Sequence, residues 1–555
     1  MKKIALVLAI VMTITLVFAG CTSGTSDTTG KQLSVNVGPE PDTIDPALNS
    51  SVDGGTIIIH LFEGLMIRDK DGKIQPGQTE TYTISEDKLT YTFTLRKGLK
   101  WSDGKDLKAS DFTYAWNRAV NPNTAADYEN MFAVIKGYSA TYAEGDTAEQ
   151  KKQKDEAVIA AKKENKALEI VADDAAGTIK VTLNSVCPYF LELCAFPTYM
   201  PVRKDVVEAN PEKWATDAAT YISNGSYKMK EWIHNSKIVM EKNKNYWDVE
   251  KIGTDTINFV LMEDDASRLS AYKNNELQFI DDMPQDELDA LKKQSDFYKK
   301  PQLGTYYISF NTKKAPLDNA KIREALLLAI NRQFICDNIG KTGQIPAGAY
   351  VPYGLTDADI TKEFREVGKK EYFAATDYEG NLEKAKKLLA EAGYPEGKGF
   401  PAIEYLYNEG TQHQQIGEAI QNDWKKLGIE VKLVSQEWSV FLNSRKNGDY
   451  FVARNGWLGD YNDPISYLDM WITGGGNNDA QWSNAQYDQL IKQIKASSDN
   501  AERMKLMHQA EDIIFAESML CPIYYYVDIY MLKDNLEGFY YSPLGFKYFM
   551  YTIVK

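Results

Sequence analysis

Residues 456–464 read Gly-Trp-Leu-Gly-Asp-Tyr-Asn-Asp-Pro, and this stretch decides the fold of the 555-residue chain. Taken alone, Asn462 and Pro464 favour a turn in which Asp460 is an ordinary turn aspartate. The stretch gains a second interpretation from other motifs, which stand before and after it along the chain.

These motifs begin near residue 43 and continue to residue 527. In order they are Thr-Ile-Asp-Pro (43–46), Leu-Phe-Glu-Gly-Leu (61–65), Phe-Thr-Leu-Arg-Lys-Gly-Leu-Lys-Trp-Ser-Asp-Gly (93–104), Ala-Ser-Asp-Phe (109–112), Asn-Gly-Ser-Tyr (224–227), Asn-Tyr-Trp (245–247), Val-Ser-Gln-Glu-Trp (434–438) and Tyr-Tyr-Tyr-Val (524–527). In this order and spacing, they resemble the extracytoplasmic oligopeptide-binding proteins of ABC importers. The resemblance covers residues 33–555, except a charged insertion near 140–168.

The resemblance implies an α/β fold of the periplasmic-binding-protein-like type II (Venus flytrap) kind, with an extra third lobe. Lobe I would comprise residues 31–63, 200–303 and 527–555. Lobe II would comprise 64–199, and lobe III 304–526. Two lobes would close over the ligand about a hinge.

Local patterns independently predict mixed α/β architecture. Leu33 to Val37 alternates as a strand does, and Tyr82 to Leu95 predicts a hairpin. Asn381 is expected to cap a helix over 382–392, which Gly393 ends. A further helix over 416–427 and a strand over 429–433 follow. Residues 148–168 predict an exposed charged helix, interpreted as a solvated insertion rather than a partner-binding arm.

The N-terminus predicts export. Lys2 and Lys3 precede an apolar run over 4–18, and small residues lead to Cys21. The predicted signal peptide is 1–20, and its end resembles the lipobox of bacterial lipoproteins, with Phe18 in place of the usual leucine. Residues 22–30 contain only Thr, Ser, Gly and one Asp, so 21–30 is expected to be a lipidated flexible tether. Ordinary secretion with an incidental cysteine is the alternative.

Composition excludes some partners. The net charge of −15 argues against nucleic acid, whose phosphates need a basic face. Contact with the membrane is expected only through the lipid anchor, and the protein is expected to be a monomer. Beyond Cys21, four cysteines without a Cys-x-x-Cys pair are interpreted as buried thiols: Cys187, Cys194, Cys336 and Cys521.

Enzyme motifs are missing. The four histidines lack metal-ligand spacing, and no Gly-x-Ser-x-Gly elbow occurs. Gly340-Lys341-Thr342 resembles the end of a phosphate loop, but Ile335 stands where the loop needs glycine. The pairs at 264–265 and 281–282 are interpreted as surface acids rather than glycosidase carboxylates. No catalytic residue, cofactor or metal is therefore expected.

Binding residues follow from the resemblance. Asp460 matches the acceptor of the peptide α-ammonium, because a carboxylate suits a charge-assisted bond. Arg454 matches a residue that meets the carboxylate of shorter peptides, and His413 one used for longer peptides. Tyr128 would close on the peptide backbone from the opposing lobe. Trp438 and Trp457 match pocket walls, and Tyr526 is a further cleft candidate.

Two segments are expected to flank the peptide as neighbouring strands. The first, residues 49–52, contains Ser50, Ser51 and Val52, and the second, residues 454–458, contains Gly456 and Leu458. The best-known relatives carry an acid in place of Ser50 and sometimes a cysteine in place of Leu458. Peptide length and pocket preference therefore stay open.

The expected function is a lipid-anchored extracytoplasmic receptor that captures oligopeptides for an ABC permease, its transmembrane subunits and their ATPases. Alternatives on the same scaffold are a dipeptide, murein peptide, chelated metal or sugar as cargo, or a peptide-pheromone sensor. A secreted hydrolase is the alternative from another class, against which the missing motifs speak.

Overall fold

The structure is a computed structural model that describes residues 31–143, 146–359 and 361–555. The predicted signal peptide, Cys21 and the tether lie outside the described residues. Among the helices of these three ranges, none is both long enough and apolar enough to cross a membrane.

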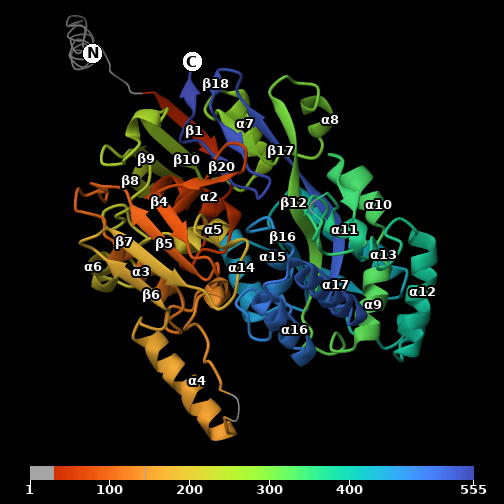
Figure 1. Ribbon diagram of the computed structural model, residues 1–555. Coiled ribbons are helices and arrows are strands. Elements are labelled where there is room, and N and C mark those ends of the chain that lie inside the picture. Colours follow the sequence, from red (N-terminus) through yellow and green to blue (C-terminus); the bar gives the residue numbers. More distant parts are fainter. Residues whose placement is uncertain (1–30, 144–145, 360) are drawn as a thin grey trace, which may run out of the picture.

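An eleven-stranded mixed sheet is the largest element, with the order β15-β14-β16-β12-β17-β11-β1-β10-β9-β8 and with β13 beside β17. The long antiparallel pair β12–β17 joins its two halves (Figure 1). The strands are β1 (Gln32–Asn36), β8 (Tyr227–Ile233), β9 (Lys237–Lys242), β10 (Thr256–Val260), β11 (Phe279–Asp281), β12 (Phe297–Phe310), β13 (Ile345–Pro346), β14 (Ile403–Asn408), β15 (Val431–Gln436), β16 (Val452–Leu458) and β17 (Leu520–Leu532).

Both long strands cross the predicted boundaries between lobes I and III. Strands of predicted lobe I lie on one side of the β12–β17 pair, and β14 to β16 of predicted lobe III lie on the other. The register of the pair shifts between Pro301 and Thr305, beside the predicted boundary at 303/304. Such irregularities bend a sheet locally. The two predicted lobes are thus halves of one sheet, and the division between them remains a prediction.

A separate four-stranded antiparallel sheet belongs to predicted lobe II, in the order β4-β5-β7-β6. The predicted hairpin is confirmed, since Thr83 pairs with Thr92 and Ile84 with Tyr91. On β5, alternate side chains are buried, as the period-two pattern requires. The strands are β4 (Thr79–Ile84), β5 (Thr90–Leu95), β6 (Ile170–Asp173) and β7 (Thr178–Thr182).

Helices and short ladders complete the fold. The helices are α2 (Val52–Leu61), α3 (Ala109–Ala119), α4 (Ala148–Lys163), α5 (Phe190–Leu193), α6 (Lys204–Ala209), α7 (Asp265–Lys273), α8 (Leu288–Leu291), α9 (Ala320–Leu328), α10 (Arg332–Phe334), α11 (Phe364–Val367), α12 (Tyr378–Glu391), α13 (Thr411–Lys425), α14 (Trp438–Asn447), α15 (Ile465–Leu468), α16 (Ala485–Ala496) and α17 (Asn500–Ala516). The ladders pair β2 (Met66–Arg68) with β3 (Ile74–Pro76), β18 (Leu536–Glu537) with β21 (Ile553–Val554), and β19 (Tyr540–Tyr541) with β20 (Lys547–Tyr548).

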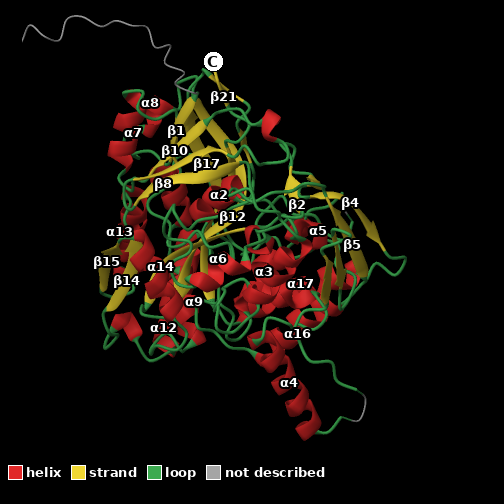
Figure 2. Cartoon of the chain, turned by 90° about the vertical axis from the view of Figure 1, so that its left-hand side faces the viewer, coloured by secondary structure: helices red, strands yellow, loops and turns green. Residues whose placement is uncertain are grey.

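The predicted charged helix over 148–168 is α4, which ends five residues earlier, at Lys163, because Leu168 is buried in the core. It projects from the body at the end opposite the C-terminus (Figures 1 and 2). None of its side chains is buried. Thr147 caps it and forms a reciprocal capping box with Gln150. Local capping and charge therefore stabilise this helix more than packing does. This agrees with its interpretation as a solvated insertion.

The predicted start of α12 is wrong by one turn. Asp377, rather than Asn381, is its N-cap, and the Asp377 carboxylate accepts a hydrogen bond of 3.1 Å from Gly380 N. Asn381 lies inside the helix and donates to Ala374 O at 2.7 Å. Two polar residues four positions apart both fit a cap, and the tertiary bond of Asn381 decides between them. Gly393, with φ +98°, ends the helix as predicted.

All four cysteines of the described chain are buried free thiols, which confirms the prediction. Burial raises the pKa of the Cys187 and Cys336 thiols to about 12. Since the thiolate is the reactive form, these two cysteines are expected to be unreactive at neutral pH.

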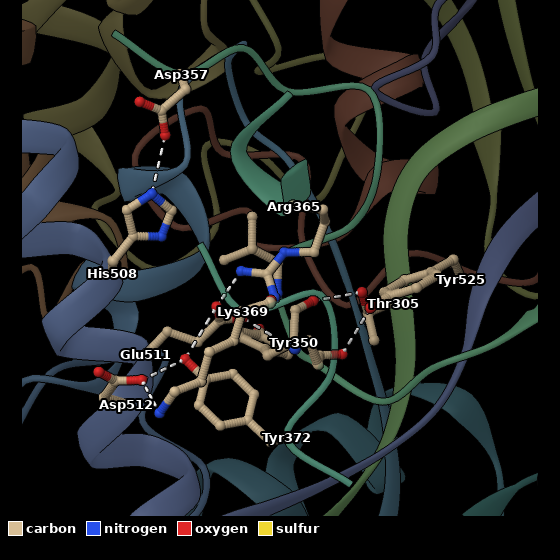
Figure 3. A network of polar contacts seen from close by, with 12 residues as sticks. Thr305, Tyr350, Asp357, Arg365, Lys369, Tyr372, His508, Glu511, Asp512 and Tyr525 are labelled. Carbon is tan, nitrogen blue, oxygen red and sulfur yellow. Dashed lines mark hydrogen bonds and ion pairs between the residues drawn. The ribbon is translucent and has the colours of Figure 1, made fainter. Parts of the chain in front are cut away.

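A buried ion pair ties the loop after β13 to α17 (Figure 3). Glu511 on α17 accepts hydrogen bonds from Tyr350 N at 3.1 Å and Val351 N at 2.9 Å, and it pairs with Arg365. Both charged side chains are fully buried. The half-buried Asp512 next to it accepts a hydrogen bond of 2.9 Å from the Tyr372 hydroxyl, which lies 3.5 Å from Glu511 Oε2.

Removing the Glu511 carboxylate should destabilise the protein strongly, because it leaves the Arg365 charge buried and unpaired. Glu511→Ala should lower the free energy of unfolding by about 3–5 kcal/mol in a urea titration. Asp512→Ala, which removes a partly exposed partner of Lys369, is the matched control and should cost less than about 1 kcal/mol. Equal losses in the two variants would contradict this assignment.

Candidate functional site

A cavity of about 390 Å³ lies where the three predicted lobes meet. Ligand pockets of proteins are typically about 300–1,000 Å³. Its lining includes the segment before α2 and residues around β11 from predicted lobe I, Tyr128 from predicted lobe II, and β16 from predicted lobe III. All twelve residues predicted to bind the ligand line it, from six separate segments of the chain.

Asp460 is a buried carboxylate without a cationic partner among the described residues. Its Oδ1 accepts a hydrogen bond of 2.9 Å from the Tyr128 hydroxyl, and its Oδ2 accepts one of 3.3 Å from Ser466 Oγ. Burial raises the Asp460 pKa well above its ordinary range, and the nearby Asp469 charge adds to the rise. The side chain therefore lacks a positive charge that the cavity has space to receive.

Arg454 presents the opposite case. Its guanidinium is buried, its Nε donates to Asn408 Oδ1 at 2.6 Å, and no described carboxylate forms an ion pair with it. The guanidinium carbon lies 5.3 Å from the Trp438 ring centroid and 5.2 Å from that of Phe441. Aromatic faces stabilise the cation in part. A planar guanidinium with free N–H groups is suited to bidentate binding of a carboxylate.

The strand between these two charges has an open edge. Residues 452–458 of β16 pair with β12 throughout, but β14 pairs only with Val452 and Ala453 on the other side. Over the described chain, residues 454–458 thus have no strand neighbour on the cavity side. An extended peptide can add to such an edge through backbone hydrogen bonds. Gly456 keeps this edge compact, since a Cβ there would lie 2.2 Å from the Tyr526 hydroxyl.

Aromatic and apolar residues wall the cavity as expected. Trp457 is held by a 2.8 Å bond from its Nε1 to Ser466 O, with its ring 6.2 Å from that of Tyr128. Trp438 Nε1 is buried without a partner. Leu458 fills space beside Gly304, where an added Cβ would lie 2.2 Å from it.

His413 lines the cavity as a neutral side chain. It stacks on Tyr306, whose hydroxyl lies 3.3 Å from His413 Nδ1. Burial lowers the His413 pKa well below its ordinary value, and the Arg454 charge lowers it further. His413 therefore offers the cavity a hydrogen bond and no positive charge.

The predicted peptide-flanking segment over 49–52 is too long by one residue, because Val52 already begins α2; Ser51, its N-cap, has extended backbone angles (φ −116°, ψ 153°), and pairing of 49–51 with a peptide stays a prediction. Ser51 Oγ accepts from Gly54 N at 3.3 Å and donates to Asn49 Oδ1 at 3.2 Å, so the hydroxyl serves the helix. Ser50 is exposed on the cavity wall. The segment borders the cavity and leads into α2.

Several cavity residues escaped the sequence analysis. The pairs 264–265 and 281–282 were interpreted as surface acids, which is wrong for Asp265 and Asp281, because both are buried. These two residues and the exposed Asp282 line the cavity. Asn408 and Arg445 were missed: the first orients Arg454, and the second pairs with Asp479 at 3.3 Å. Their residue types carry no signal without the fold, although Arg445 lies only nine positions before Arg454.

Contacts beside the cavity and within its lining join predicted lobes II and III. Tyr189 stacks on Tyr461 with ring centroids 4.7 Å apart, and Asn462 N donates to Glu192 at 3.0 Å. Lys446 forms a 2.8 Å ion pair with Asp127. Together with the Tyr128–Asp460 bond, these contacts close the cavity from both sides.

The fold is that of type II periplasmic binding proteins, a class in which ligands are enclosed between lobes. Residues 73–479 match the model of the bacterial extracellular solute-binding proteins, family 5 (middle region), and the chain belongs to this family. It is 36% identical to the oligopeptide-binding protein OppA of Bacillus subtilis, with 100% of both chains covered. It is 34% identical to the dipeptide-binding protein DppE of the same species, over 93% of this chain and 90% of that one.

Comparison with solved structures identifies the conformation. Haemophilus influenzae OppA in complex with the peptide RPPGFSPFR superposes with a TM-score of 0.85, at 30% identity, over 95% of this chain and 99% of that one. The unliganded open form of the murein tripeptide-binding protein MppA, also 30% identical, gives 0.60 over 95% and 98%. At equal identity and near-equal coverage, this structure therefore resembles the peptide-bound relative more than the open one, and the contacts between predicted lobes II and III agree with a closed arrangement.

Lowering the pH should draw the ligand-free protein toward the closed form. Burial raises the Asp460 pKa when the cleft is closed, so the closed form binds this proton more tightly than an open form does. The extra stability that this proton gives the closed form is complete below the ordinary aspartate pKa of about 4. It is lost as pH rises through the raised pKa of Asp460. Small-angle X-ray scattering should show the radius of gyration falling with pH.

Asp460→Asn is the matched variant for this scattering experiment, because it keeps the shape of the side chain and cannot titrate. Its contraction with falling pH should be smaller than that of the wild type. An equal contraction would mean that Asp460 does not couple protonation to closure.

Proposed function

We propose that the protein captures oligopeptides by their backbone and charged ends. The observation that supports this most strongly is a pair of buried, uncompensated charges of opposite sign at one cavity. Asp460 lacks a cation, Arg454 lacks an anion, and the open edge of β16 begins at Arg454 and runs toward Asp460. A zwitterionic peptide supplies both missing charges and a ladder of amides between them.

The binding sequence follows from these positions. A peptide enters the open cleft and adds to residues 454–458 as an extended strand, which requires no particular side chains. Its α-ammonium reaches Asp460, and closure brings Tyr128 onto the same carboxylate, where it already donates a hydrogen bond. Arg454 receives the carboxylate of a short peptide, while His413 offers a neutral contact to a longer one. Ligand binding favours the closed form because only that form surrounds the peptide.

The relatives support this cargo. The two curated relatives are named for oligopeptides and dipeptides, and the crystallised relative holds a nine-residue peptide. This chain has no covalent step in our proposal: the protein binds and releases its ligand unchanged. We infer that it delivers the peptide to the transmembrane subunits and ATPases of an ABC importer, as a monomer outside the cytoplasm.

Cys21 would hold the receptor at the membrane. The apolar run before Cys21 favours export and acylation, and the polar residues after it favour a flexible tether. A tether raises the effective concentration of the receptor near its permease.

Asp460 should recognise the free amino end of the peptide. Asp460→Ala should weaken the binding of a peptide with a free N-terminus by about 3–5 kcal/mol, because the bound ammonium loses its buried partner. N-acetylation of the same peptide should weaken binding to the wild type by a similar amount. Isothermal titration calorimetry measures all four combinations.

The control is the comparison of both proteins with both peptides. Once Asp460 is absent, N-acetylation of the peptide should change the binding free energy little. If acetylation costs the variant as much as the wild type, the ammonium binds elsewhere. A wild-type protein that binds no peptide at all would overturn the proposed function itself.

Cys21→Ser should release the protein from the membrane without changing peptide affinity. Labelling of the host with a palmitate analogue should mark the wild type and leave the variant unmarked. A labelled variant, or an unlabelled wild type in the membrane fraction, would contradict lipidation at Cys21.

A further inference from the structure

A short segment of predicted lobe II is packed against predicted lobe III. It follows α3 and comprises residues 127–130, which read Asp-Tyr-Glu-Asn. Its Tyr128 hydroxyl reaches Asp460, to which the proposed function assigns the peptide amine. Asp127 and Asn130 contact predicted lobe III at other points, so the segment as a whole lies against that lobe.

The backbone of Asp127 lies directly against Gly476, in the loop before α16. A Cβ at position 476 would lie 2.6 Å from Asp127 Cα and 2.9 Å from Asp127 O, closer than real Cβ atoms approach such atoms. Asn477 Nδ2 donates to the same carbonyl at 3.3 Å. The φ of Gly476 is not positive, so its backbone conformation does not itself require glycine. The close approach of the two predicted lobes does require it.

A second contact of this segment lies outside the cavity. Asn130 Nδ2 donates to Asp469 Oδ2 at 3.3 Å, and the Asn130 carbonyl accepts a bond of 3.4 Å from Lys495 Nζ. Lys495 also forms a 2.8 Å ion pair with Asp469 within predicted lobe III. None of these three described residues lines the cavity, so a captured peptide would not touch them. This contact is therefore available to closure whatever the ligand is.

The ion pair between Asp127 and Lys446 stabilises the lobe contact less than its distance of 2.8 Å suggests. Burial raises the pKa of Asp127 even though Lys446 and Ser50 lower it, so desolvation outweighs the attraction. The Lys446 side chain is also 43% exposed, and solvent weakens an ion pair. The fit of backbone against backbone at Gly476 is therefore the part of this contact that matters most.

We propose that Gly476 sets the affinity for every peptide alike, because its missing side chain lets residues 127–130 pack against predicted lobe III when the cleft closes. The inference rests on the proposed function and deepens it by naming a residue that controls closure without reading the ligand. Opening the cleft separates the two predicted lobes, so the Gly476 contact belongs to the closed arrangement alone. A cost to that arrangement multiplies the dissociation constant of each ligand by the same factor.

Gly476→Ala tests this inference by adding one Cβ. It should raise the dissociation constant about ten- to a hundredfold, the usual range for an overpacked contact. Calorimetry should give the same factor for a tripeptide, for tripeptides with other side chains and for a longer peptide. Urea unfolding of the ligand-free variant should match that of the wild type, because the open form does not contain the contact.

Gly474→Ala is the matched control in the same loop. A Cβ at position 474 would meet no atom within 4 Å, so this variant should keep the wild-type affinity, although its φ of +73° strains alanine locally. Asn130→Ala gives a second variant should Gly476→Ala fail to fold. Loss of its bond to Asp469 should weaken the binding of all these peptides by one common factor of about two- to tenfold.

The outcomes separate this inference from the proposed function. Unchanged affinity in Gly476→Ala, or an equal loss in Gly474→Ala, would overturn the role of the lobe contact and leave peptide capture intact. A loss confined to one peptide length or side chain would make Gly476 part of a ligand subsite, which also overturns the inference. If the wild type binds no peptide at all, the proposed function fails, and this inference fails with it.

Discussion

The structure depends on one electrostatic constraint: the closed cleft removes Asp460 and Arg454 from water without giving either an opposite charge. Desolvated charges without partners are costly, so the ligand-free closed form is a state that the protein leaves readily. A ligand that brings both charges removes that cost and makes closure favourable. In the proposed function, selection for zwitterionic cargo and the movement of the lobes would thus have the same physical origin.

The fold places these charges with little freedom. β16 is anchored along its whole length to β12, which continues through the central pair with β17 into the other half of the large sheet. One end of the cleft is therefore a rigid strand edge. The opposing wall carries Tyr128, in the segment after α3 of predicted lobe II, whose strands form the separate four-stranded sheet. Side-chain contacts such as the Tyr189–Tyr461 stack join this wall to predicted lobe III.

Much of the fold could be predicted from the sequence, because period-two alternation determines the hairpin that ends at Leu95 and motif order identifies the class. The resemblance also found Asp460 and Arg454. Other features depend on tertiary context. Ser51 serves as a helix cap because α2 begins one residue later, and Asp282, a left-handed residue directly after β11, lines the cavity. Neither property is visible in residue type or spacing.

Peptide capture through free termini is the central claim, and native mass spectrometry of the protein purified from its host tests it most directly. Under gentle desorption the holoprotein should carry a ladder of masses that fragment as peptides with unblocked amino ends. The sequences of the bound peptides should vary, since the open edge of β16 would form hydrogen bonds with the peptide backbone rather than with its side chains. A single bound species that is not a peptide, such as one sugar, would contradict the account.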